Sequence, residues 1–518
     1  MDITLLKEPL VEFADNFLCD DPKKGITETG FYSLSNNTHN SEIHYSIIGT
    51  NQNIEDFKTW IHSFQNPIEA SAKEIKIKDN TEIEDDGTIA DNGLFSDEDF
   101  EFDFCVEENV TKIINKKLNP DFPGFNKDSI FKCEFLLDSS NVNAIKKTDI
   151  DTILKSKSAN KEKSQEIIDL YISAYQEILE YGNKIPDICY IIVPSEVYKK
   201  LASIKNGKSY LNFRRQLKAR TFACNGSIPI QIVLEDTITG SKKSMQDLSM
   251  TAWNFVVAQY YKTGNSIPWT LTDVDSDTCF IGISFHKIFD GENKYMRSSI
   301  AQAFNKDGKG LIFTGKQFEW NSKKTRVSTP HLQYDYAKEL ISNVLNNYVK
   351  INKHTPKRVV IHKTSDFWDA YKHKDYAEID GFTEGIQETL NVNVDIDFVT
   401  AKAAKQKLFR ETGEYPVMRG TLLKIDTYKG VLYTTGYIPY YESYPGVHIP
   451  MGIHIETIGE TTLTQICQEI LALTKLNFNN CNYYSSLPIT LQFSQKVGEI
   501  LQYLPEGIEP PNRYFYYM

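Results

Sequence analysis

The sequence lacks the features of a membrane protein, of a secreted protein and of enzymes with a Walker or Rossmann nucleotide-binding motif. No apolar run approaches the roughly 20 residues that span a bilayer, and the start, MDITLLKEPLVEF, has neither a cationic flank nor a long apolar core. The eight cysteines form no CxxC pair and no zinc-ligand spacing, and several lie in apolar runs such as DICYIIV and DTCFIGI. Walker and Rossmann glycine fingerprints, heptads and internal repeats are also missing. We therefore expect a cytoplasmic protein with reduced, buried thiols and no membrane partner.

Charge of one sign is missing from two segments, and both absences are informative. The net charge is -12, but Glu82 to Glu108 alone holds twelve acids and no Lys or Arg. Lys199 to Arg220, in contrast, holds eight Lys or Arg and no acid. Clustered cations bind phosphates whatever the net charge of the protein, so the basic segment is compatible with a nucleic-acid partner. The alternative is an ordinary solvated basic surface.

The length and the apolar pattern predict an α/β protein of two or more domains. At 518 residues the chain exceeds what one hydrophobic core usually serves, and its composition is that of ordinary globular proteins. Helical periodicity at 163–182 leads into the apolar strand DICYIIV, and a second strand, IPIQIVLED, follows two cationic helical stretches. A second series begins at DTCFIGISFHKIF and continues through the long helix 334–351 and the strand RVVIHK. The acidic stretch 78–110 is typical of a loop insertion, or of a segment that docks or masks a surface.

Four polar side chains in the first α/β region could form an anion site. Arg214 and Lys218 lie four apart on a helical pattern, Gln231 opens the next strand, and Lys262 ends a later helix. A terminal phosphate is best bound by Arg or Lys, an amide donor and free backbone N–H groups. The spacing alone is weak, because cations at i and i+4 occur on many exposed helices.

The sequence resembles a known family along nearly its whole length. NFRRQLKA, SIPIQIV and AQYYKTGNSIPWTL resemble the guide 5′-end pocket of the MID domain of Argonaute proteins. FIGISFH, RVVIHKTSDF, YPVMRGT, YPGVHIPMGI, ALTKLNFNN, LPITLQFSQKVGEIL and NRYFYYM resemble the blocks of a PIWI domain, in order. EPLVEFADNFLCDDPKKG, HYSIIGT and PDFPGF are similar to the opening of the short prokaryotic Argonautes, which lack PAZ and N domains. Two departures are Arg214, at a place often held by an aromatic residue or His, and the acidic insertion.

The resemblance implies a layout and a guide pocket. We expect a Rossmann-like MID domain at 161–275 and an RNase H-like PIWI domain at 276–518. An N-terminal segment, 1–160, with the acidic insertion 78–110, is expected to pack on MID. Arg214, Lys218, Gln231 and Lys262 would bind the guide 5′-phosphate. Mg²⁺ would be bridged by guide phosphates and the terminal carboxylate of Met518, unless NRYFYYM is an ordinary aromatic C-terminal strand.

The resemblance also implies that the PIWI domain does not cut. Where the family has its first two catalytic Asp residues, this chain has Ser284 and Thr364, which cannot replace metal-bridging carboxylates. The nearby acids Asp366, Asp369 and Glu378 are interpreted as helix-surface acids. Sequence context predicts that the three strand histidines, His362, His448 and His454, are core or groove residues and not metal ligands.

The function implied is guide-directed binding that activates a second protein. The chain would hold a 5′-phosphorylated guide RNA, recognise complementary single-stranded target DNA without cleaving it, and activate an APAZ-domain effector. A TIR or sirtuin-like effector that depletes NAD in anti-phage or anti-plasmid defence (abortive infection) is favoured, and higher oligomers on activation are compatible with it. Three alternatives remain: an endonuclease with displaced carboxylates, the partner of a nuclease-type effector, or an α/β scaffold that binds only protein.

Overall fold

The computed structural model describes residues 2–71, 115–206, 209–241, 246–263, 266–290, 293–303, 310–320, 329–371, 373–374, 376–413, 415–445, 449–450, 452–505 and 507–518. Side chains at 209, 286–303 and 493–496 are outside the description. The acidic insertion predicted at 78–110 lies outside the described residues, as does His448. No helix in the described ranges is long and apolar enough to cross a membrane.

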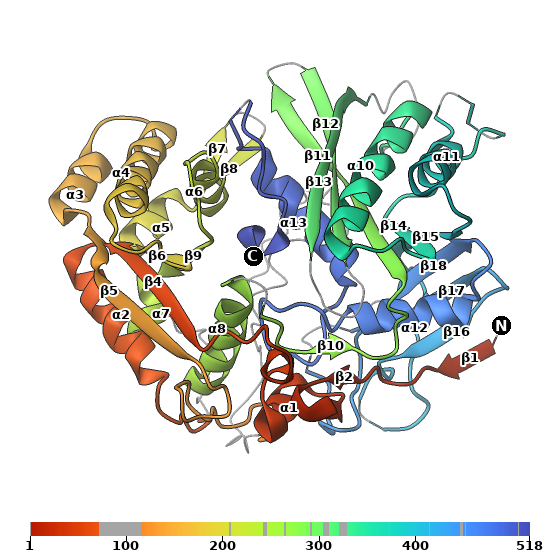
Figure 1. Ribbon diagram of the computed structural model, residues 1–518, viewed down its shortest axis with the longest axis horizontal. Coiled ribbons are helices and arrows are strands. Elements are labelled where there is room, and N and C mark those ends of the chain that lie inside the picture. The colour runs from red at the N-terminus through yellow and green to blue at the C-terminus, as the bar shows by residue number, and fades with distance from the viewer. Residues whose placement is uncertain are drawn as a thin grey trace, which may run out of the picture.

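The first half of the molecule is built on a parallel sheet, seen at the left of Figure 1. In the described residues its strand order is β5 (Glu134–Ala144), β4 (Glu42–Gly49), β6 (Ile188–Val193) and β9 (Ile230–Leu234). Tyr190 and Ile192 of β6 face the core that α2 (Asn51–Ser63) and α8 (Leu248–Lys262) complete. Cys189 and Ile191 face a second core, completed by α3 (Lys147–Lys155), α4 (Asn160–Tyr181), α5 (Ser195–Leu201) and α6 (Phe213–Phe222). Burial on both faces explains why β6 is apolar at every position.

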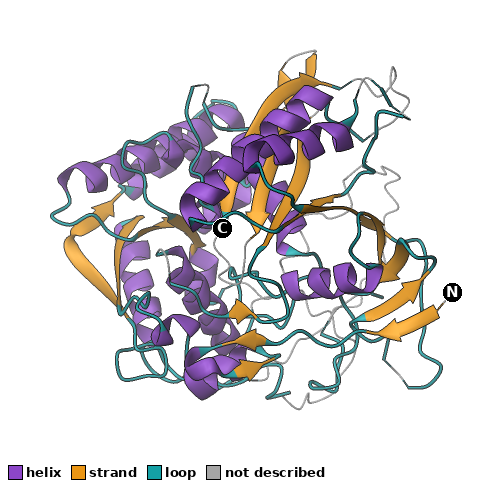
Figure 2. Ribbon diagram, turned by 45° about the vertical axis from the view of Figure 1, so that its right-hand side comes forward, coloured by secondary structure: helices purple, strands orange, loops and turns teal. Residues whose placement is uncertain are grey.

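The second half is a larger mixed sheet. Over the described ranges its order is β1 (Asp2–Leu5), β16 (Thr421–Lys424), β17 (Lys429–Leu432), β18 (Ile453–Ile458), β15 (Asp395–Ala403), β14 (Arg358–Lys363), β11 (Thr278–Asp290), β12 (Asn293–Ala303) and β13 (Leu311–Glu319). β11, β14 and β15 run parallel. One face is covered by α10 (Tyr334–Asn352) and α11 (Glu378–Leu390), the other by α12 (Leu463–Leu473) and α13 (Ile489–Leu501) (Figures 1 and 2).

Short elements complete the fold and join the two sheets. They are α1 (Pro22–Thr29), α7 (Glu235–Thr239), the short turns η1 (Ala14–Asn16), η2 (Tyr32–Ser35) and η4 (Tyr514–Tyr517), the sheet β10 (Thr270–Leu271), β2 (Val11–Glu12) and β3 (Leu18–Cys19), and the hairpin β7 (Ser203–Asn206) and β8 (Ser209–Asn212). One core cluster continues from the first sheet through α8 to α12 and α13. The seven cysteines that the structure describes are free and buried, as expected.

The α/β class and the two predicted sheets are confirmed, but the layout differs from the predicted one in two places. β4 and β5 lie within residues 1–160, yet they are strands of the first sheet itself, since β4 pairs with both β5 and β6. Apolar side chains of β4 enter both cores and those of β5 enter the first. β1 pairs instead with β16 in the second sheet, at the N label of Figure 1. Residues 1–160 therefore do not form a separate segment packed on the first domain. The sequence patterns also give no indication of β12, whose polar residues lack strand alternation.

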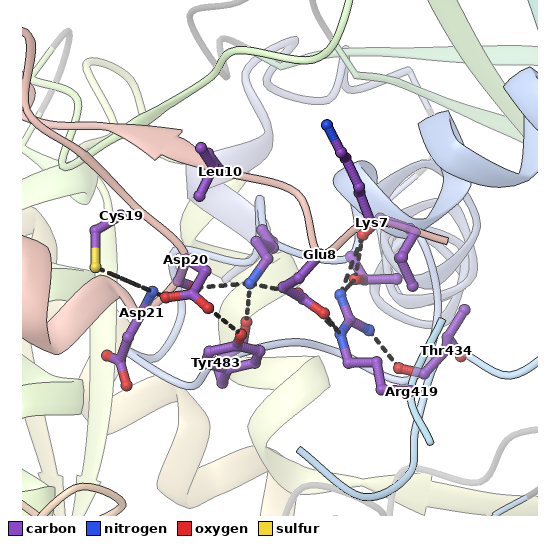
Figure 3. Close-up of polar contacts among 12 residues, drawn as sticks. Lys7, Glu8, Leu10, Cys19, Asp20, Asp21, Arg419, Thr434 and Tyr483 are labelled. Carbon is purple, nitrogen blue, oxygen red and sulfur yellow. Dashed lines mark hydrogen bonds and ion pairs between the residues drawn. The ribbon is translucent and has the colours of Figure 1, made fainter. Parts of the chain in front are cut away.

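A buried ionic network holds the segment after β1 against the second half of the molecule (Figure 3). Glu8 pairs with Arg419 (Oε2 to Nε, 3.0 Å) and with Lys475 (Oε1 to Nζ, 2.7 Å). The Arg419 and Lys475 side chains are 1% and 0% exposed. Lys475 Nζ also donates to the Asp20 carbonyl oxygen, and the Tyr483 hydroxyl donates to the Asp20 carboxylate. Burial alone would raise the pKa of Glu8, but the two cations hold it below its ordinary value.

We expect Glu8→Gln to destabilise the protein by about 3 kcal/mol, because it leaves two buried cations without their acid. Urea unfolding measures the effect, and Glu442→Gln is the control. Glu442 is 74% exposed in its pair with Lys117, so its loss should cost under about 1 kcal/mol.

The effect has a defined pH dependence. Because the folded-state pKa of Glu8 is lowered, its stabilisation is complete above the ordinary Glu value of about 4.3. It is lost as the pH falls through the folded-state pKa, so the difference between wild type and Glu8→Gln should shrink in acid. A difference that stays constant on acidification would contradict an ionised Glu8.

Candidate nucleic-acid interface

Helix α6 separates an apolar side from a cationic side. Asn212 caps its start by accepting a hydrogen bond from the backbone N–H of Arg215. Phe213 and Leu217, four residues apart, are fully buried in the core of the first sheet. Arg214 and Lys218 have the same spacing one position later, so they share a neighbouring face of the helix. Arg214 is exposed, whereas Lys218 is 8% exposed.

The C-terminal turn lies between the two halves and contacts Lys218. Tyr514 stacks near Tyr261 of α8, with 5.0 Å between ring centroids, and Tyr517 lies 5.1 Å from Phe222 of α6. These contacts bring the chain end to α6, where Lys218 Nζ donates to a carboxyl oxygen of Met518. The segment NRYFYYM therefore ends in the short turn η4 and not in an aromatic strand.

A second lysine lies at the end of α8. Lys262 is 1% exposed, and its Nζ donates to Oε1 of Gln231 on β9. The residue before it, Tyr261, is the one that contacts Tyr514. The structure thus brings together Lys218 with Met518 and Lys262 with Gln231, and Arg214 lies one helical turn from Lys218, toward solvent.

The same helix α6 is joined to α13 of the second sheet, a contact that the sequence patterns did not indicate. Arg215 Nη2 lies 2.7 Å from Glu499 Oε2. The Tyr503 hydroxyl accepts from the backbone N–H of Asn212 and donates to the carbonyl oxygen of Tyr210 in the β7–β8 hairpin. No local signal could have paired these residues, because about 290 residues separate them.

At its other end α13 presses against the centre of the second sheet. A Cβ on Gly282 of β11 would lie 1.9 Å from the backbone oxygen of Thr490, so only glycine allows this approach. His362 of β14 is 1% exposed, and its Nδ1 lies 2.8 Å from Thr490 Oγ1. Burial, with Arg358 nearby, lowers the pKa of His362 to about 3. It is a core residue, as predicted, and the predicted groove residue His454 is half-buried on β18.

Ser284 and Thr364 lie at the same level of neighbouring parallel strands. Ile283 of β11 is in register with Lys363 of β14, and Ser284 and Thr364 follow them directly. Ser284 is half-buried and Thr364 is exposed at the strand end. The two hydroxyl residues thus lie side by side, Thr364 just after the carboxyl end of β14 and Ser284 in the middle of the longer strand β11.

Beside this place lies a buried ion pair. Lys363 Nζ is 2.6 Å from Glu378 Oε2, and both side chains are 0% exposed. Glu378 also accepts from the backbone N–H groups of Leu332 and Trp368, and its Oε2 lies 3.1 Å from His331 Nδ1. Burial would raise the pKa of Glu378, but Lys363 and His331 hold it below its ordinary value. Burial lowers the pKa of Lys363, and the nearby carboxylate of Glu378 offsets only part of this lowering.

The prediction for Glu378 is therefore wrong: it is a buried acid, not a helix-surface one, because it starts α11 facing the end of β14. Asp366 is exposed and pairs with Lys402, and Asp369 is half-exposed. Within the described ranges, no group of three or more His, Cys, Asp or Glu side chains converges to hold a metal ion.

Solved structures of Argonaute proteins have a fold similar to that of this chain. Clostridium butyricum Argonaute, bound to a guide DNA and a 19-mer target DNA, matches with a TM-score of 0.62 at 16% identity, over 99% of this chain and 54% of that one. Drosophila Piwi matches with a TM-score of 0.57 at 11% identity (100% and 56%), and Marinitoga piezophila Argonaute in complex with 5′ OH guide RNA with 0.54 at 12% identity (97% and 59%). The chain has the Argonaute fold.

Its two sheets are those of the MID and PIWI domains, in that order. The chain spans about half the length of the Argonautes it matches. No protein-family profile and no curated protein matches the sequence. At these identities the likeness concerns the fold, so the roles of individual residues rest on their own geometry.

Proposed function

We propose that this protein is a guide-binding short Argonaute that recognises a target without cutting it and passes the signal to a partner protein. The observation that carries the proposal is the pair of buried lysines at the MID–PIWI boundary. Lys218 and Lys262 are 8% and 1% exposed. Lys218 Nζ donates to a carboxyl oxygen of Met518, and Lys262 Nζ donates to Gln231, while Tyr261, the residue before Lys262, contacts Tyr514 of the C-terminal turn. Holding ammonium groups in such a place is costly unless they serve an anion.

A 5′-phosphate fits the chemistry of this place. Lys218 and Lys262 supply charge-assisted donors, the Gln231 amide a neutral donor, and Arg214 an exposed guanidinium one turn away. Of the matched Argonautes, one is bound to a guide DNA and a target DNA and another to a guide RNA. For this chain we propose a 5′-phosphorylated guide RNA and a complementary single-stranded DNA target, as its resemblance to short prokaryotic Argonautes implies.

The residues at the pocket also fit Mg²⁺. The Met518 carboxyl group supplies a hard oxygen ligand at Lys218, and guide phosphates would supply others. When bound, Mg²⁺ would neutralise phosphate charge. Met518 would hold the ion and Lys218 would orient that carboxyl group.

Two features support a PIWI domain that does not cut. Ser284 and Thr364 replace carboxylates at one level of the sheet. Glu378, the buried acid nearest to them along the chain, is already engaged by Lys363. Glu378 also accepts from the backbone N–H groups of Leu332 and Trp368, so its oxygens are occupied and it is a poor metal ligand.

A partner is proposed because the resemblance to short prokaryotic Argonautes implies one. We propose an APAZ-domain effector of the TIR or sirtuin-like class, whose NAD hydrolysis is switched on by target recognition in defence against phages or plasmids.

The guide pocket gives the first test. Lys218→Ala and Lys262→Ala should each remove about 1.5 to 3 kcal/mol of binding for a 5′-phosphorylated guide and much less for a 5′-hydroxyl guide. Fluorescence anisotropy with the two guides measures this. The control is Arg220→Ala, because Arg220 lies on the same helix but pairs with Asp169 of α4. Equal losses for both guides would show that the lysines contact only the backbone.

Cleavage gives the second test. The guide-loaded chain should leave a matched target intact with Mg²⁺ or Mn²⁺, since two of the metal-holding carboxylates are replaced. Denaturing gels of end-labelled target measure this. Discrete cleavage opposite the centre of the guide by the pure chain would favour the endonuclease with displaced carboxylates.

The partner gives the third test. Co-expressed with the product of its neighbouring gene, the chain should form a stable complex that consumes NAD only when guide and matched target are both present. NAD and DNA are followed together as matched and mismatched targets are added. Loss of DNA at constant NAD would indicate a nuclease-type effector, and failure to form a complex would contradict the partner proposal.

A further inference from the structure

Two loops leave the carboxyl ends of the neighbouring parallel strands β14 and β15. The described residues of the first loop are 364–371, 373–374 and 376–377, and those of the second are 404–413 and 415–420. Lys402 at the end of β15 pairs with Asp366 in the first loop. In open α/β sheets, ligands bind outside the carboxyl ends of the strands. Neither loop contains any residue of the MID pocket described above.

Each loop holds one aromatic ring out in solvent. Tyr371 is 97% exposed and Phe409 is 75% exposed. In both loops the residue before the ring is fixed through its backbone N–H: Ala370 donates to the Asp380 carboxylate, and Leu408 donates to the Tyr433 hydroxyl. The rings are therefore presented by anchored backbone.

The anchors themselves are buried or stacked. Tyr433 is fully buried, and its hydroxyl donates to the carbonyl oxygen of Gln406, so it holds the second loop at two points. In the first loop Trp368 is stacked between His331 and His373, with centroid distances of 3.6 and 3.7 Å. Such anchoring without burying the tips is typical of a binding surface.

The charge of the second loop indicates what it binds. The sequence 404–420 has four cations, Lys405, Lys407, Arg410 and Arg419, and two acids, Glu411 and Glu414, so the loop is cationic overall. Lys405 and Lys407 are exposed. The Arg410 guanidinium lies 4.8 Å from the Tyr437 ring centroid, and its covered Nη1 has no hydrogen-bond partner among the described residues. Cations beside exposed aromatic rings are the combination that binds single-stranded nucleic acid, by backbone attraction and base stacking.

We propose that Tyr371 and Phe409, with the exposed Lys405 and Lys407, form a stacking platform for unpaired bases of the target DNA, where that strand extends beyond the guide. The proposal rests on the proposed function. Bases within the guide–target duplex are already stacked, so only an unpaired segment can lie on Phe409 and Tyr371. Stacking does not depend on base identity, so the platform is tolerant of sequence.

The test compares three targets on the guide-loaded full chain: a fully paired strand, the same strand with a short single-stranded tail, and the same tail built from abasic units. The ordinary tail should tighten binding about tenfold for each base stacked, and the abasic tail should lose that gain. Phe409→Ala and Tyr371→Ala should remove the gain with the ordinary tail and change nothing with the abasic one. Tyr181→Ala, which removes a ring 77% exposed at the end of α4, is the control and should have no effect.

Several outcomes would overturn the platform. They are equal losses for tailed and untailed targets, an abasic tail that binds as well as an ordinary one, and variants that affect only guide loading or only the complex with a partner protein. Guide loading is measured first, so failure of the proposed function is seen before any target is added. In that event, oligothymidine and its abasic counterpart on the unloaded chain test the platform by the same comparison.

Discussion

The carboxylate of Glu8 is the contact on which the joining of the two halves depends. Arg419 and Lys475 are buried cations of the PIWI domain, and their acid comes from the opposite end of the chain (Figure 3). Separating them would leave charge in the interior, which costs far more than a surface pair. The first residues therefore form β1, the edge strand of the PIWI sheet next to β16, before the chain enters the MID sheet as β4. Neither sheet can move away without breaking these contacts.

A second constraint is α13, which contacts the centre of the PIWI sheet at one end and helix α6 at the other. At its start Thr490 touches Gly282 and His362 in the centre of the PIWI sheet. At its end Glu499 pairs with Arg215 of α6, the helix that carries Lys218. One helix thus links α6, which carries Lys218, to the centre of the PIWI sheet. On the proposed function, a guide bound at Lys218 would follow a path set by this link.

The predictable parts of this structure are those with a local signature. Buried parallel strands such as β6 and β14 are continuous apolar runs, and α10 repeats apolar residues at helical spacing. The contacts of Lys218 and Lys262 could be anticipated only through the family resemblance, because cations at this spacing occur on many helices. Glu8, Glu378 and Arg215 carry no local sign of their partners, since a long-range ion pair has no period. The membership of β1 in the PIWI sheet is hidden for the same reason.

The residues at the carboxyl ends of β14 and β15 in the PIWI sheet are suited to binding and not to cleavage. Where paired carboxylates would gather metal ions, the chain places Ser284, Thr364 and a lysine already neutralised by Glu378. Around them it places cations and exposed rings on loops that are fixed at the base. Cations attract a strand whatever its sequence, and exposed rings stack only with bases that are unpaired. On the proposed platform, such an edge would bind single-stranded DNA in preference to paired DNA without cleaving either. On the proposed function, binding energy gained there is available to hold the target, and a partner must convert it into a reaction.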